Sequence, residues 1–223
     1  MDPPDAFGRI LGLLHCAALD DARWPDATAL IEEAVGTAGS TLTVGEGFGD
    51  DVRLHFARIL QRGHGREDLA REYFNVYLPH DEGIPRLRRR PHGELVHVPD
   101  LYTEDERKTS PVYNEGLRRM GSREGLLVRF DGPDGLRVIW GCADPVGGSG
   151  WESGQLRLVE RLLPHIHRTV LTRQALAAAE ALGAGLAGLL DHGGIGVVHL
   201  DRGGRVLAAN DVALDVLRRG EGL

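Results

Sequence analysis

The chain has 223 residues, of which 42% are hydrophobic and 26% are charged, a composition typical of a folded globular protein. Its net charge of −7 argues against a duplex-DNA-binding surface on this chain, because such surfaces carry excess Lys and Arg. Two cysteines are too few for a disulfide framework, no apolar run could span a bilayer, and the acidic start does not form a secretory signal. We therefore expect a cytoplasmic protein with no membrane partner.

The first third of the chain predicts a helix pair, two strands and a further helix. Apolar residues recur at helical spacing in the helical segments, and β-branched residues alternate in the first strand. Trp24 and Pro25 are expected to turn the chain between the first two helices. We place helices at 7–18, 27–35 and 66–78 and strands at 41–44 and 52–60, with a helix as the alternative for 52–60.

The middle of the chain predicts a short strand at 94–98 and a helix opened by Pro111. A dense basic run precedes the strand, and we interpret it as a solvated edge rather than a nucleic-acid contact. The run consists of Arg86, Arg88, Arg89 and Arg90.

A β-hairpin is the clearest pattern, with strands at 125–130 and 136–143 around a turn rich in Gly and Pro. Side chains alternate across a strand, so one face of this hairpin is uniformly apolar and should be covered by helices. The other face is mixed and either meets solvent or lines a pocket. The mixed face carries Leu127, Arg129, Arg137 and Ile139.

A long helix is predicted at 154–190, and Pro164 should kink or restart it. Its apolar residues follow a 3-4 spacing that favours a helix-pair seam in a parallel homodimer. Packing of the same residues on their own sheet is the alternative, and both arrangements could use different faces of the helix. The proposed dimer residues are Leu156, Val159, Leu163, Ile166, Val170 and Leu186.

The last segment predicts two short strands, at 196–200 and 205–209, joined by a tight turn. A helix follows, with Asn210 as its N-cap and Asp211 placing a negative charge at its positive end. This pattern is typical of the opening of a second α/β domain.

Several segments together resemble the sensory half of bacterial LuxR-type transcriptional regulators, in which a GAF-like domain is followed by a PAS-like segment and a C-terminal helix-turn-helix. The resemblance rests on Asp100-Leu-Tyr, Ser110-Pro-Val-Tyr-Asn-Glu, Trp151 and the stretch Gln155-Leu-Arg-Leu-Val-Glu-Arg-Leu-Leu-Pro-His. It implies an α+β fold with a GAF-like antiparallel sheet, flanking helices, a long C-terminal exit helix and an incomplete PAS-like α/β segment.

The resemblance also implies a domain layout. We expect a GAF-like sensory domain at 1–153, a signalling helix at 154–192 and the first part of a PAS-like domain at 193–223. No helix-turn-helix follows Leu223, so DNA binding is expected only through a C-terminal domain outside this sequence. The ligand-binding signature of acyl-homoserine-lactone receptors is not found here, and that ligand is not implied.

Aromatic and polar residues near the mixed sheet face form a candidate pocket for an unidentified small-molecule effector. The alternative is that each aromatic is a core or rim residue with a satisfied polar tip. The candidates are Tyr73, Tyr77, Asp81, Tyr102, Tyr113, Arg129 and Trp140.

We therefore expect a non-enzymatic sensory and dimerisation region that relays effector binding through the long helix. Two other functions stay open: a dimerisation scaffold that binds no small molecule, and an enzyme or enzyme-regulatory domain. The sequence shows no convergent nucleophile, base and oxyanion donors, no zinc-ligand spacing and no haem or flavin motif, so we expect neither catalytic residues nor a metal or cofactor.

Overall fold

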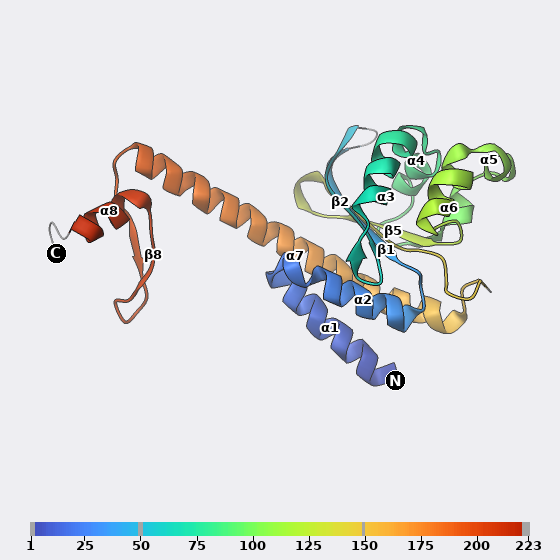
Figure 1. The fold of residues 1–223 in the computed structure, drawn as a ribbon, viewed down its shortest axis with the longest axis horizontal. Coiled ribbons are helices and arrows are strands. Elements are labelled where there is room, and N and C mark those ends of the chain that lie inside the picture. The colour runs from blue at the N-terminus through green and yellow to red at the C-terminus, as the bar shows by residue number, and fades with distance from the viewer. Residues whose placement is uncertain (1–2, 49–50, 149, 220–223) are drawn as a thin grey trace. The chain divides into compact units, whose positions relative to one another are not determined.

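The structure is a computed structural model that describes residues 3–48, 51–148 and 150–219 (Figure 1). It divides into two compact units, Met1–Arg173 and Gln174–Leu223. The first unit contains a six-stranded antiparallel sheet with helices on both faces, and a long helix follows it in the chain. The predicted α+β arrangement of an antiparallel sheet, flanking helices and a long C-terminal helix is confirmed.

The sheet joins strands from the two ends of the first unit. Its order is β3-β2-β1-β6-β5-β4, so the hairpin β5–β6 pairs with the hairpin β1–β2 through β1 and β6. The strands are β1 (Ser40–Phe48), β2 (Asp51–Gln61), β3 (His64–Gly65), β4 (Leu95–His97), β5 (Leu126–Asp131) and β6 (Leu136–Cys142). The hairpin at 125–143 is confirmed, whereas the two-residue β3 was too short to leave a pattern in the sequence.

Three helices cover the apolar face of the sheet: α1 (Pro3–Leu19), α2 (Trp24–Val35) and the first half of α7 (Ser153–His192) (Figure 1). The buried side chains between them form one continuous core that includes Val128, Val138 and Trp140. The expectation that Trp24 and Pro25 form a turn is wrong. Both lie in the first turn of α2, where the missing N–H of proline costs no hydrogen bond, and the 3-10 turn η1 (Asp21–Arg23) precedes them.

Short helical segments cover the other face of the sheet (Figure 1). The predicted helix at 66–78 is instead divided into α3, a π-helical segment η2 and a 3-10 turn η3, because Pro79 has no N–H with which to continue an α-helix. The segments are α3 (Glu67–Glu72), η2 (Tyr73–Tyr77), η3 (Leu78–His80), α4 (Gly83–Arg88), η4 (Val98–Leu101), α5 (Glu104–Thr109), η5 (Val112–Gly116) and α6 (Leu117–Met120).

Helix α7 runs through Pro164 as one helix, so of the two effects predicted for the proline, a kink or a restart, the restart does not occur. Pro164 has no N–H, so the helix lacks one backbone hydrogen bond there. Burial of the neighbouring Leu162, Leu163 and Ile166, which are 0%, 6% and 0% exposed in the core of the first unit, compensates for this loss. The boundary between the two compact units lies inside this helix, after Arg173.

Most of the proposed dimer residues are used by this packing. Val159, Leu163, Ile166 and Val170 are buried against the sheet and its helices, and Leu156 packs on the same core. This is the alternative that the sequence left open, and it leaves the four buried side chains little surface to offer a second chain, whereas Leu156 is only partly buried. Leu186, which lies in the second unit, is 51% exposed.

The second unit contains the end of α7, a two-stranded ribbon of β7 (Val198–Leu200) and β8 (Val206–Ala209), and α8 (Asp211–Arg219). The N-cap prediction is confirmed: Asn210 Oδ1 accepts hydrogen bonds from the N–H groups of Ala213 at 3.2 Å and Val197 at 2.7 Å. One side chain thus fixes both the start of α8 and the chain before β7.

The buried Glu32 on α2 ties this helix to the sheet. Its carboxylate accepts hydrogen bonds from Ser40 Oγ at 2.8 Å on β1 and from Gly63 N at 3.2 Å beside β3. Removal from water raises the pKa of Glu32 above its ordinary value of 4.5, although the hydrogen bonds to Ser40 and Gly63 oppose the shift. A raised folded pKa means that ionisation opposes folding, so this group costs stability as the pH rises above 4.5.

We predict that Glu32→Gln makes the protein more stable near neutral pH, by on the order of 1 kcal/mol, because the amide has no charge to desolvate. At acidic pH, where the unfolded chain is also protonated, the difference should shrink toward zero. Urea unfolding at about pH 4 and about pH 7 measures both values, with the exposed Glu33→Gln as the matched control. A variant that is equally destabilised at both pH values would contradict the prediction.

Candidate functional site

A partly closed cavity of about 340 Å³ lies between the mixed face of the sheet and the short helical segments that cover it. The predicted mixed face of the hairpin supplies part of its floor, and strands β1 and β2 supply the rest. The floor residues are Thr41, Thr43, Gly45, Ile59, Leu127, Arg129, Arg137 and Ile139. Of the two options for this face, solvent or a pocket, the structure therefore shows the pocket.

The cover of the cavity is mostly apolar and comes from the segments between β3 and β5. Aliphatic side chains dominate it, which suits a ligand with an apolar body. The cover includes Phe74, Leu78, Ile84, Pro85, Val98, Leu101, Leu117 and Met120. These residues lie in helical segments of six residues or fewer, which are too short for a period of 3.6 residues to mark the buried positions.

A buried carboxylate is the polar centre of the cavity. Asp81 is 6% exposed and accepts hydrogen bonds from the hydroxyl of Tyr73 and, at 2.7 Å, from the hydroxyl of Tyr102. Backbone N–H groups of Gly83 at 2.8 Å and Ile84 at 3.3 Å donate to the same side chain. The three candidates Tyr73, Asp81 and Tyr102 thus meet at one point of the cavity wall.

The pKa values of both tyrosines are raised, primarily because burial disfavours the phenolate and secondarily because the Asp81 charge lies beside each hydroxyl. Both hydroxyls therefore stay protonated and act as donors to the carboxylate at physiological pH. Such charge-assisted hydrogen bonds compensate the cost of removing the Asp81 carboxylate from water.

Local sequence explains why Asp81 has this position. It ends η3 and precedes α4, and its side chain accepts from the first free N–H groups of that helix, as an N-capping residue does. Gly83 is required because a Cβ at this position would lie 2.8 Å from the hydroxyl oxygen of Tyr102. The absence of a side chain at Gly83 lets Tyr102 approach the carboxylate.

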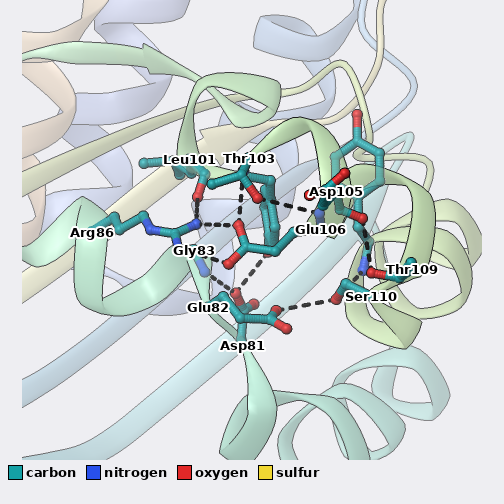
Figure 2. A network of polar contacts seen from close by, with 12 residues as sticks. Asp81, Glu82, Gly83, Arg86, Leu101, Thr103, Asp105, Glu106, Thr109 and Ser110 are labelled. Carbon is teal, nitrogen blue, oxygen red and sulfur yellow. Dashed lines mark hydrogen bonds and ion pairs between the residues drawn. The ribbon is translucent and has the colours of Figure 1, made fainter.

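A second set of contacts joins α4 to α5 on the outer side of Asp81 (Figure 2). The Arg86 guanidinium donates to both carboxylate oxygens of Glu106, at 2.5 and 2.7 Å, and to the Leu101 carbonyl at 2.7 Å. Arg86 and the backbone N–H of Thr103 hold the pKa of Glu106 at about 2, so this pair stays ionised. Ser110 Oγ donates to Glu82 at 3.1 Å, which fixes the residue next to Asp81.

The four other candidates have different positions. Arg129 lines the cavity, where its guanidinium contacts Asp131 and donates to the Arg90 carbonyl. Tyr77 and Tyr113 lie beside the cavity, in the core under the helical cover, and Tyr77 packs against Gly116 so closely that a Cβ there would be 2.8 Å from its ring. Trp140 is 1% exposed in the core on the opposite face of the sheet, so it does not line the cavity.

The described residues offer no group of three or more metal-ligating side chains, and no helix among them is long and apolar enough to cross a membrane. Burial raises the pKa of the Cys142 thiol, the only cysteine in contact with the cavity, so the thiol is not poised to act as a nucleophile. The described lining also contains no histidine that could serve as a base.

The fold of the chain is shared with regulator domains of known structure. CepR2 from Burkholderia cenocepacia, an N-acylhomoserine lactone dependent LuxR family transcription factor, is 14% identical with a TM-score of 0.56; the match covers 78% of this chain and 98% of that one. The LBD domain of VqsR from Pseudomonas aeruginosa is 17% identical with a TM-score of 0.53, covering 76% and 97% of the two chains. No protein-family model and no curated protein sequence matches the chain. At these identities the comparison establishes a common fold.

We predict that Tyr102→Phe destabilises the first unit by about 1–3 kcal/mol, because it removes one of the donors to a buried charge. The matched control is Tyr113→Phe, whose hydroxyl makes a single 3.3 Å hydrogen bond to the Arg123 carbonyl and should cost less. Urea unfolding measures both. Equal losses of unfolding free energy in the two variants would show that the hydrogen bond to Asp81 stabilises the fold no more than the one to the Arg123 carbonyl.

Proposed function

We propose that this chain is the sensory region of a LuxR-type transcription regulator, and that its first unit binds a small-molecule effector without catalysing a reaction. The observation that carries the proposal is the buried Asp81, held by two tyrosine hydroxyls at the wall of an otherwise largely apolar cavity. Ligand sites typically combine an apolar lining with a few fixed polar groups. The fold shared with CepR2 and VqsR supports the same function.

The effector would act through the sheet. Leu127 and Ile139 face the cavity, whereas their neighbours Val128 and Val138 face the core that contains α7. A ligand that fills the cavity would press on one face of strands whose other face packs against this helix. To shift the helix, the ligand needs only a different affinity for two arrangements of α7. Coupling free energies of about 1–3 kcal/mol between a ligand site and a distant site are typical.

The proposal keeps the expected domain layout: a sensory domain at 1–153, a signalling helix at 154–192 and a PAS-like segment at 193–223. The signal would reach a DNA-binding domain outside this sequence, in the cytoplasm. The first half of the helix would act as part of the sensory core, and the second half would carry the response to the next unit.

We predict that native mass spectrometry of the purified chain detects bound small-molecule mass that is lost on denaturation. Asp81→Asn should reduce this mass, because the amide donates where the carboxylate accepts and so disturbs both the tyrosines and the ligand. Asp105→Asn on α5 is the control, since the Asp105 side chain lies outside the cavity lining. Wild-type protein that carries no ligand, and that no metabolite extract stabilises against heat, would favour the scaffold function instead.

Dimerisation, as part of the proposal, would use the second half of α7. Leu182, Leu186 and Leu189 are 65%, 51% and 72% exposed and follow the 4-3 spacing of a coiled-coil seam. This set retains Leu186 from the sequence-based prediction and replaces the residues that pack in the first unit. A second copy of the helix offers the same stripe, which is the self-complementary surface that a two-fold dimer requires.

We predict that Leu182→Glu combined with Leu186→Glu weakens a homodimer by at least about tenfold in dissociation constant, because two like charges would meet in the seam. Sedimentation velocity over a concentration series measures the effect. Val146→Glu, at an apolar position that is 69% exposed in the first unit, is the control. A wild-type monomer, or an unchanged dimer in the double variant, would exclude this seam.

A further inference from the structure

The basic run at 86–90 is not a uniform solvated edge. Arg86 is engaged with Glu106, and Arg90 pairs with Glu94 at 3.4 Å while its carbonyl accepts from Arg129. Arg88 and Arg89 instead line the cavity. Within the described part of the chain, neither of these two side chains makes a hydrogen bond or an ion pair.

The charged residues around the cavity are unevenly distributed. Four arginines line it, at 88, 89, 129 and 137, whereas Asp81 is the single acidic residue in the described lining. Arg129 and Arg137 both contact Asp131, and the Asp81 carboxylate is satisfied by neutral donors. Arg88 and Arg89 therefore leave an excess of positive charge at the cavity of a protein whose net charge is −7.

We propose that the ligand of this cavity is a small amphipathic carboxylic acid. Its carboxylate is bound by Arg88 and Arg89, since guanidinium groups match a carboxylate in charge and in hydrogen-bond geometry. Its apolar middle lies on Leu127 and Ile139, and a hydroxyl or N–H at its other end donates to Asp81. This inference rests on the proposed function and specifies the ligand class of the same site.

The length of α4 sets the distance between the two polar ends. Asp81 stands just before the helix and Arg88 is its last residue, so a rise of 1.5 Å per residue separates their backbones by on the order of 10 Å. A medium-length alkyl chain bridges this distance. The cavity volume of about 340 Å³ is at the lower end of the range for small-molecule sites, which also favours a small ligand.

Isothermal titration calorimetry with three probes tests the proposal. ω-Hydroxyoctanoate carries both polar ends, its methyl ester lacks the anion, and octanoate lacks the hydroxyl. We expect the methyl ester to bind the wild-type chain about tenfold more weakly than the acid, as loss of a charge-assisted contact predicts. Octanoate should also bind more weakly, because it leaves Asp81 without a ligand donor.

The decisive variant is Arg88→Gln combined with Arg89→Gln, which should weaken binding of ω-hydroxyoctanoate about tenfold and leave binding of the methyl ester unchanged. Arg71→Gln combined with Arg118→Gln removes the same charge from exposed positions outside the cavity lining and is the matched control. The unfolding midpoints of both double variants check that the fold is retained.

Each outcome has one meaning. The proposal is supported if the wild-type chain binds the methyl ester more weakly than the acid, and if the double variant at Arg88 and Arg89 loses binding of the acid but not of the ester. Equal binding of acid and ester overturns the carboxylate inference but leaves a ligand-binding sensor in place. Loss of acid binding in the control variant as well attributes the effect to overall charge and overturns the inference. Absence of binding by all three probes overturns this ligand class, and the native mass measurement then decides the proposed function separately.

Discussion

A carboxylate that is removed from water must be surrounded by hydrogen-bond donors, and Asp81 meets this requirement with groups from three segments of the chain. Tyr73 comes from the π-helical η2, Gly83 from α4, and Tyr102 from the residue after η4. Satisfying one buried charge therefore fixes three short segments that have little helical stability of their own. The cavity is the space that these segments leave above the sheet.

The two faces of the sheet are covered in different ways. On the apolar face, α1, α2 and α7 supply long regular stripes of buried side chains. On the mixed face, short segments are joined by polar contacts such as Arg86 with Glu106 (Figure 2). A ligand of the cavity would meet the mixed face, whereas α7 packs on the apolar face.

The position of the positive charges is the feature that links the site to a ligand class. In the sequence, four neighbouring arginines suggest one exposed patch. In the structure, alternate helical directions send Arg86 toward Glu106 and Arg88 toward the cavity. An unpaired cation beside a partly closed, apolar cavity attracts an anion more strongly than the same cation does in open solvent. Whether each arginine of the run pairs with a carboxylate or lines the cavity therefore affects the binding of an anionic ligand.

The sequence by itself determined the elements whose pattern is local: the hairpin at 125–143 with its two faces, the amphipathic helices, and the Asn210 cap. Residue periodicity and capping chemistry act over a few positions, so they can be read without tertiary contacts. The tertiary structure alone decided which aromatic residues meet Asp81, because Tyr73 and Tyr102 are distant in sequence and lie in irregular segments. It also decided that α7 passes Pro164 and that its apolar stripe belongs to its own unit: a 3-4 spacing fits any apolar partner, and only the presence of the sheet beside it selects one.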